Sequence, residues 1–157
     1  VTGVQTCALP ICGTETTPLV RVPNIEMSSV KRALDMGAQG VIVPYAQSAQ
    51  EIEEAMRYGK YPPTGVRGVA GDRCVKWGLG FQDYLARANE ETWVIPLIET
   101  RGAVEQIDAI LEVPGVEVIQ FGPADLSASY GYLGSWDEAG DVGKHLLEIR
   151  EIGRAHV

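Results

Sequence analysis

The sequence predicts an α/β fold in which about four parallel strands alternate with helices. Short apolar runs rich in β-branched residues recur along the chain, and each is too short for a buried helix. Between these runs lie segments whose apolar residues recur with the spacing of an amphipathic helix. Alternation of this kind is typical of a parallel sheet with helices packed against it.

The first part of the chain supplies two strand–helix units. Each unit begins with a short apolar run that a proline closes, and continues into a segment with one apolar face. Serine residues at the start of both helical segments are suitable N-caps. The expected elements are a strand at Leu19–Val22, a helix from Ser28 or Ser29 through Met36, a strand at Gly40–Val43 and a helix at Ser48–Tyr58.

A long segment rich in glycine, residues 59–80, separates these units from the rest of the chain. Such loops in compact domains are usually functional or contact a partner, and a mobile surface insertion is the alternative. The elements expected after it are a helix at Phe81–Asn89, a strand at Trp93–Ile98, a helix at Arg101–Glu112, a strand at Val116–Phe121, a loop at 131–140 and a helix at Asp141–Arg150. A complete (β/α)8 barrel needs about 250 residues. We therefore expect a partial (β/α)8, or TIM, barrel.

The composition excludes several classes of partner. A net charge of −8 argues against binding to nucleic acid or to an anionic membrane surface. No apolar run approaches the roughly 20 residues of a membrane-spanning helix. The three cysteines have neither disulfide nor zinc spacing, which indicates a reducing, cytoplasmic location.

The two ends of the chain differ in character from the rest. Residues 1–11 carry no charge and no clear period, and DNA that encodes residues 152–157 can be the reverse complement of part of the DNA that encodes residues 1–11. Both ends resemble a sequencing-library adapter, and a pair of unusual native tails is the alternative. We expect adapter-like artefacts at 1–11 and 151–157, and a partial-barrel domain at 12–150 that belongs to a longer protein.

Two acidic residues follow the last two expected strands. Glu99 comes directly after Trp93–Ile98, and Asp125 comes shortly after Val116–Phe121. Parallel neighbours place their C-terminal ends at one edge of the sheet, so both carboxylates should face one pocket. Such a pair can form a site for a hard divalent cation. The alternative is that both acids are ordinary charges at the starts of helices.

Beyond these patterns, the chain from Leu19 to about Gly134 resembles the HpcH/HpaI aldolases, which are metal-dependent pyruvate aldolases that cleave 4-hydroxy-2-oxo acids. Each matching piece is short, but the pieces occur in the right order and at plausible spacing. They are VRVP (20–23), KRALDMGAQGVIVP (31–44), YPPTGVRGV (61–69), DYLARANEE (83–91), IET (98–100) and FGPADLS (121–127).

The resemblance implies a role for five residues. Glu99 and Asp125 match the family's ligands of a divalent metal, Mg²⁺ or Mn²⁺, with Co²⁺ as an alternative. Arg21 matches the arginine that stabilises charge beside the substrate carbonyl, a role that suits a permanently charged guanidinium. Ala124 matches the residue whose backbone N–H holds the pyruvate carboxylate, together with Asp125. Asp35 matches the aspartate that supports the catalytic histidine, and an exposed helix acid is the alternative.

Two departures from the family pattern leave the substrate open. The family's general-base histidine lies on an earlier strand–helix segment, and His145 does not match it. Leu97 stands where the close pyruvate aldolases have a glutamine, so Pro96–Glu99 looks more like the CoA-ester lyase branch of the superfamily. A non-catalytic protein that binds 2-oxo acids and a purely structural α/β piece are further alternatives. No lysine ends an expected strand, which argues against a Schiff-base route.

The sequence thus predicts a carbon–carbon lyase that performs metal-dependent, reversible aldol cleavage of a 4-hydroxy-2-oxo acid to pyruvate and an aldehyde. We expect the chain alone to be inactive, because the histidine segment is not part of it. The expected partners are a small-molecule 2-oxo acid and, by family resemblance, further copies of the whole protein in a homo-oligomer.

Overall fold

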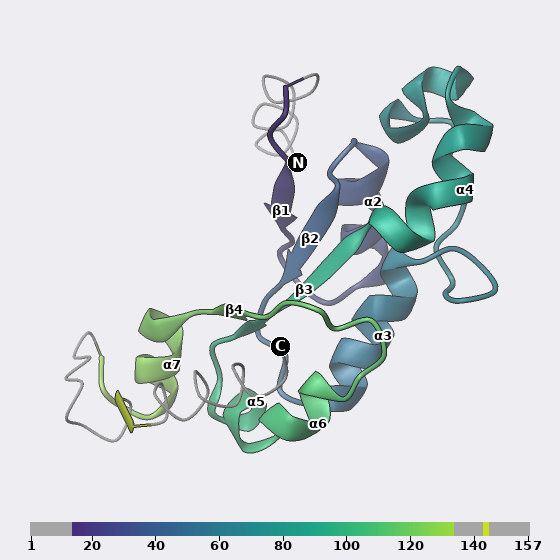
Figure 1. Ribbon diagram of the computed structural model, residues 1–157. Coiled ribbons are helices and arrows are strands. Elements are labelled where there is room, and N and C mark those ends of the chain that lie inside the picture. The colour runs from purple at the N-terminus through teal and green to yellow at the C-terminus, as the bar shows by residue number, and fades with distance from the viewer. Residues whose placement is uncertain (1–13, 134–142, 145–157) are drawn as a thin grey trace.

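The computed structural model describes residues 14–133 and 143–144. Its four strands form one parallel sheet in the order β1-β2-β3-β4, as Figure 1 shows. The strands are β1 (Leu19–Arg21), β2 (Gly40–Val43), β3 (Trp93–Ile98) and β4 (Gln120–Phe121). Helices flank the sheet, so the predicted half-barrel of four parallel strands is confirmed.

The helices follow the strands as the sequence pattern requires. Ser48 caps the helix after β2, where its hydroxyl accepts a hydrogen bond from the Glu51 N–H at 3.2 Å. None of the helices in the described ranges is long and apolar enough to span a bilayer. The helical elements are α2 (Met27–Asp35), α3 (Ala49–Gly59), the 3₁₀ element η1 (Arg73–Gly78), α4 (Phe81–Glu91), α5 (Arg101–Glu105), α6 (Ile107–Leu111) and α7 (Pro123–Ser129).

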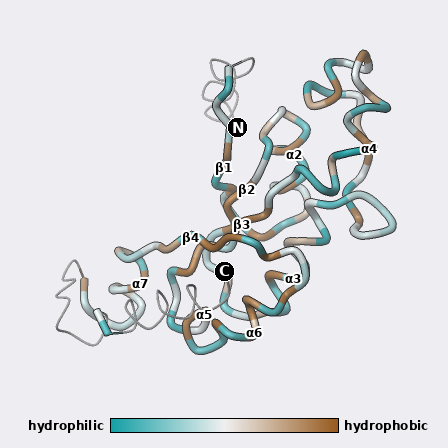
Figure 2. Tube along the Cα trace, in the orientation of Figure 1, coloured by the Kyte–Doolittle hydropathy of each residue, from teal (hydrophilic) through white to brown (hydrophobic). Residues whose placement is uncertain are grey.

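The sheet has one face packed against helices. Side chains alternate between the two faces along each strand, and on the packed face they are buried with apolar residues of the helices. Figure 2 shows apolar residues along the central strands and more polar residues on the surrounding connections. The central members of this core are Val30, Leu34, Val41, Val43, Ile52, Val94, Ile98 and Ile110.

Several boundaries differ from the sequence expectation. The strand expected at Val116–Phe121 pairs only at Gln120–Phe121. The helix expected at 101–112 is divided at Gln106, whose side-chain oxygen accepts a hydrogen bond from Ala49 N–H at 3.3 Å. Glu26, rather than Ser28 or Ser29, occupies the N-cap of α2. Most of the expected loop at 131–140 and helix at 141–150, and the whole of both adapter-like ends, lie outside the described residues.

The segment 59–80 is anchored to the domain by a buried arginine. Arg67 is 1% exposed and donates to Asp35 Oδ1 at 2.9 Å and to the Tyr84 hydroxyl at 3.1 Å. Its guanidinium carbon lies 4.6 Å from the centre of the Tyr61 ring and 5.7 Å from that of Tyr84, which is cation–π geometry. Lys31 also contacts Asp35. Arg67 therefore ties this segment to α2 and α4.

Candidate metal and oxo-acid site

The structure brings Glu99 and Asp125 together at one edge of the sheet. Glu99 directly follows β3, and Asp125 lies in the first turn of α7, just after β4. Both line a cavity of about 420 Å³ that Arg21 and Ala124 also line. The negative charge of Asp125 is near enough to raise the pKa of Glu99, although burial is the larger cause. Four of the five residues singled out from the sequence thus share one cavity.

Glu99 is held by the backbone around it. The residue is 2% exposed, and its Oε1 accepts a hydrogen bond from the Tyr45 N–H at 2.8 Å. Tyr45 has a left-handed backbone with φ of 55°. Glu99 Oε2 packs on the backbone of Gly122, where a Cβ would lie 2.9 Å away. The neighbouring Thr100 hydroxyl donates to the Ala46 carbonyl at 2.9 Å. These contacts restrict the carboxylate to one position.

The electrostatics of Glu99 favour a positive partner. Burial raises the pKa of Glu99, and the nearby negative charge of Asp125 raises it further, while the Tyr45 N–H and the Arg21 charge act in the opposite direction. A buried carboxylate beside a second acid is stabilised by taking up either a proton or a cation. The local arrangement therefore fits a bound cation, because the cation can replace the proton between the two acids.

The donor set suits a hard cation with open positions. Mg²⁺ is commonly bound by one or two carboxylates and keeps its other positions for water and substrate oxygens. Within the described residues, no group of three or more His, Cys, Asp or Glu side chains could enclose a metal. Two carboxylates facing a cavity therefore suit Mg²⁺ or Mn²⁺ better than a closed structural zinc site.

The start of α7 adds backbone donors to the same cavity. Pro123 has no N–H, and the first N–H of α7 to bond within the helix is that of Leu126, which donates to the Gly122 carbonyl at 3.0 Å. The N–H groups of Ala124 and Asp125 precede this bond, so they are the backbone donors at this turn that can reach an anion. Leu97 and Gln120, which are paired between β3 and β4, line the same cavity.

Asp35 is the fifth residue, and the structure places it elsewhere. It ends α2, near the N-terminal edge of the sheet, where the Gln39 N–H donates to the Pro18 carbonyl at 2.9 Å just before β1. There Asp35 is 5% exposed and paired with Arg67. Within this chain it does not meet Glu99, and its expected role beside a histidine stays a prediction. Conversely, sequence reasoning assigned no role to Tyr45 or Gly122, although a glycine between a strand and a proline is a signal of close packing.

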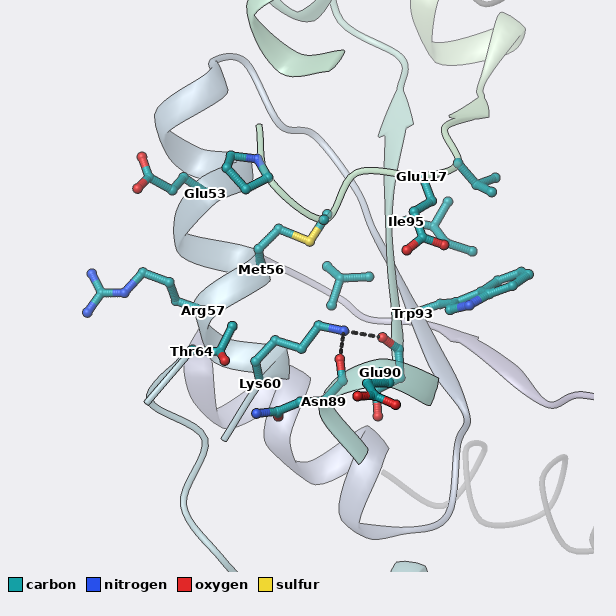
Figure 3. A pocket seen from close by; sticks show the side chains of 15 residues that line it. Glu53, Met56, Arg57, Lys60, Thr64, Asn89, Glu90, Trp93, Ile95 and Glu117 are labelled. Atoms are coloured by element: carbon teal, nitrogen blue, oxygen red, sulfur yellow. Dashed lines mark hydrogen bonds between the residues drawn. The ribbon is translucent and has the colours of Figure 1, made fainter. Parts of the chain in front are cut away.

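A larger cavity of about 520 Å³ lies between α3 and the start of β3, as Figure 3 shows. Lys60 points into it but donates to the carbonyls of Asn89 and Thr92 at 2.6 and 2.7 Å. Burial lowers the pKa of Lys60, and the charge of Glu117 raises it. Because the Lys60 ammonium already donates to two carbonyls, it is less available to a ligand than the carboxylates of the smaller cavity around Glu99.

Comparison with known proteins identifies the family of the chain. The family model described as HpcH/HpaI aldolase/citrate lyase matches residues 4–156. The 4-hydroxy-2-oxovalerate aldolase of Novosphingobium aromaticivorans is 41% identical over 125 residues, which cover 77% of this chain and 47% of that protein. The 4-hydroxy-2-oxo-heptane-1,7-dioate aldolase of Shigella sonnei (strain Ss046) is 39% identical over 143 residues, which cover 88% and 54%. The chain thus spans about half the length of these curated relatives.

Solved structures of related proteins also resemble the chain. An HpcH/HpaI aldolase/citrate lyase family protein from Burkholderia cenocepacia J2315 superposes with a TM-score of 0.87 at 34% identity, and the match covers 99% of this chain and 62% of that one. A structure described as citrate synthase SbnG has a TM-score of 0.82 at 31% identity, with 99% and 59% covered. The chain therefore belongs to the HpcH/HpaI aldolase/citrate lyase family.

Proposed function

We propose that this chain carries the metal- and oxo-acid-binding part of a carbon–carbon lyase. The reaction is the reversible aldol cleavage of a 4-hydroxy-2-oxo acid to pyruvate and an aldehyde. The observation that carries the proposal is that Glu99, Asp125 and Arg21 line one cavity at the C-terminal edge of a parallel sheet. The names of the curated relatives supply the substrate class.

The residues of the cavity have distinct proposed roles. Glu99 and Asp125 would hold a divalent ion, Mg²⁺ or Mn²⁺, which when bound acts as a Lewis acid toward the 2-oxo acid. Arg21 would place a permanent positive charge beside the carbonyl oxygen on which negative charge develops during cleavage. The N–H groups of Ala124 and Asp125 would bind the carboxylate of pyruvate at the start of α7.

The proton chemistry is proposed to need residues beyond those described. A base must accept the proton of the C4 hydroxyl as the carbon–carbon bond breaks. Both histidines of the chain, His145 and His156, lie outside the described residues. We propose that the base comes from a further segment of the whole protein, because His145 does not match the family's general-base histidine, and that the chain alone shows no turnover. A Schiff-base route is disfavoured because the described residues that line the cavity include no lysine.

We also propose that the whole protein assembles with further copies of itself. Trp77 and Leu79, in the 59–80 segment, are 70% and 93% exposed, and large apolar side chains in such positions are suited to a protein contact. Light scattering of the whole protein tests this proposal, because a monomer would contradict it.

A second candidate is a CoA-ester lyase or citrate-forming enzyme with the same metal acids. Two observations favour it. Leu97, 3% exposed, gives the cavity an apolar wall where the close pyruvate aldolases have a glutamine, and one similar structure is described as a citrate synthase. Cleavage of citramalyl-CoA or malyl-CoA by the whole protein, without cleavage of 4-hydroxy-2-oxo acids, would select this candidate.

The deciding experiment combines binding and turnover. Mn²⁺ and pyruvate are titrated into the chain, and aldol cleavage is measured in the whole protein with and without EDTA. The proposal expects Mn²⁺-dependent binding of pyruvate and activity that both EDTA and Glu99→Gln abolish. Activity that survives both treatments would refute the metal-dependent reaction, and binding without turnover in the whole protein would indicate a non-catalytic relative.

A further inference from the structure

We infer that Gly122 and Thr100 are positioning residues that hold the Glu99 carboxylate in a single orientation. Gly122 acts by having no side chain, so that Glu99 can pack directly on its backbone. Thr100 acts by fixing the turn after β2, whose Tyr45 N–H binds Glu99 Oε1. Gly122 follows β4 and the turn that Thr100 contacts follows β2, so the two flank Glu99 at the end of β3. Gly122, Thr100 and Tyr45 together form what we call the Glu99 clamp.

The space at Gly122 explains why a glycine stands there. Its φ of −113° is open to any L-residue, so backbone conformation does not require glycine. A Cβ at this position would lie 2.8 Å from Glu99 Cβ and 2.9 Å from Glu99 Oε2, closer than real Cβ contacts. The backbone cannot easily move away, because the Gly122 N–H donates to the Ile98 carbonyl at 2.9 Å. A side chain here would therefore displace Glu99.

Thr100 secures the opposite side of the clamp. Its hydroxyl donates to the Ala46 carbonyl at 2.9 Å and accepts from the Ala103 N–H at 3.1 Å, so it joins the turn after β2 to the start of α5. Tyr45, the residue before Ala46, has the left-handed φ of 55°. A non-glycine residue adopts this conformation only when its surroundings hold it there. The Thr100 bond to the next residue supplies that restraint, and so it fixes the direction of the Tyr45 N–H.

The consequence for metal binding rests on the proposed function, whereas the geometry of the clamp does not. A carboxylate that is oriented before the ion arrives loses less freedom on binding. Groups that orient metal ligands without touching the metal typically change affinity by about 10- to 100-fold when they are removed. Neither Gly122→Ala nor Thr100→Val alters the charge or the oxygen donors of the site.

The first test measures the hydrogen bond between Tyr45 and Glu99 without any metal. Hydrogen exchange of the Tyr45 amide is measured by NMR in the metal-free wild-type chain, in Gly122→Ala and in the control Gly71→Ala, whose new Cβ would meet no atom within 4 Å. We expect exchange at Tyr45 to be at least about tenfold faster in Gly122→Ala, because its hydrogen bond to Glu99 is lost. The control should match the wild type. Equal protection in Gly122→Ala would overturn the role of Gly122.

A second pair of variants covers the case in which Gly122→Ala fails to fold. Thr100→Val keeps the shape of the side chain but removes both hydrogen bonds, whereas Thr100→Ser retains them. The clamp requires faster Tyr45 exchange in Thr100→Val and wild-type exchange in Thr100→Ser. If valine and serine give the same protection, Thr100 does not position the turn.

The third measurement is the affinity for Mn²⁺ in the absence of pyruvate, determined by electron paramagnetic resonance. We expect Gly122→Ala and Thr100→Val to bind Mn²⁺ about 10- to 100-fold more weakly than the wild type and Gly71→Ala. Unchanged affinity together with faster Tyr45 exchange would overturn the link between the clamp and the metal. A wild-type chain that binds no Mn²⁺ would refute the proposed function instead, and Tyr45 exchange would still decide whether the clamp exists.

Discussion

Glu99 and Asp35 are buried carboxylates at opposite edges of the same sheet, and their surroundings differ in the sign of the nearest charge. Asp35 accepts a hydrogen bond from the buried Arg67 and also contacts Lys31. Glu99 instead lies beside a second acid, Asp125, and its pKa is raised chiefly by burial. Within the described residues, Asp35 forms ion pairs with protein cations, whereas Glu99 forms none and has only the more distant charge of Arg21 in its cavity.

The difference separates a structural charge from a functional one. A buried ion pair between Asp35 and Arg67 needs nothing from outside, so its removal should affect folding. Two adjacent acids are unfavourable for the fold alone, and such an arrangement persists where an external cation or proton completes it. On this basis we propose that the Arg67–Asp35 edge stabilises the domain, and that the Glu99–Asp125 edge binds a ligand.

The largest expected effect tests the ion pair between Arg67 and Asp35. Arg67→Met leaves Asp35 buried without its main cation, and we expect the free energy of unfolding to fall by about 3 kcal/mol. Urea denaturation measures it. The matched control is Arg87→Met, which removes an exposed pair with Glu91 and should change stability by less than about 0.5 kcal/mol. Equal effects of the two substitutions would remove the contrast between the two edges.

The next prediction tests the two adjacent acids, Glu99 and Asp125. Glu99→Gln removes one of two negative ligands, and we expect Mn²⁺ affinity to fall at least about 100-fold, or about 2.7 kcal/mol. Isothermal titration calorimetry measures the loss. Glu112→Gln removes the charge of an exposed acid in the same way. Because solvent ions screen exposed charges, this control should bind Mn²⁺ within about twofold of the wild type. Similar affinity in both variants would show that Glu99 is not a ligand.

The pH dependence of stability sharpens the comparison. Because the pKa of Glu99 is raised in the folded chain, the folded state binds more protons than the unfolded state above the ordinary value of 4.5. The metal-free wild type should therefore lose stability relative to Glu99→Gln as the pH rises through this window. Urea midpoints of both proteins, measured from about pH 4 to about pH 7, test the sign. A difference that stays constant with pH would contradict it.

The smallest expected effect lies within the cluster around Arg67. The Tyr61 hydroxyl is buried and has no hydrogen-bond partner among the described residues, while its ring lies against Arg67. Tyr61→Phe keeps the ring, so unfolding free energy should stay the same or rise by up to about 1 kcal/mol. Tyr61→Leu removes the ring and should be less stable than Tyr61→Phe by about 1 kcal/mol. Thermal melting of the pair measures it, and equal stability would show that the ring does not stabilise the arginine.

The candidate site was accessible from the sequence because local pattern and topology agree there. β3 and the end of β4 are visible as apolar runs, and parallel pairing places whatever follows them at one edge. The positions of Glu99 and Asp125 follow from that rule alone, since both come within a few residues of a strand end. Arg21 joins them because it ends β1 on the same face of the sheet.

Apart from the N-cap of α2, the main features that sequence reasoning missed depend on contacts between distant residues. Arg67 reaches Asp35 across 32 positions, and no periodicity encodes that pairing. The division of the helix at Gln106 accompanies a bond to Ala49, 57 positions away. The Glu99 clamp likewise depends on Tyr45, whose unusual φ no local pattern announces.

The strand order has a consequence for synthesis on the ribosome. Since spatial order repeats chain order, each newly emerged strand finds its neighbour already formed, and no early strand waits for a late one. Glu99 and Asp125 follow the last two strands, so they meet only after nearly all of the described chain has left the exit tunnel. A nascent chain of this protein would thus form most of its core before the proposed ion site is complete.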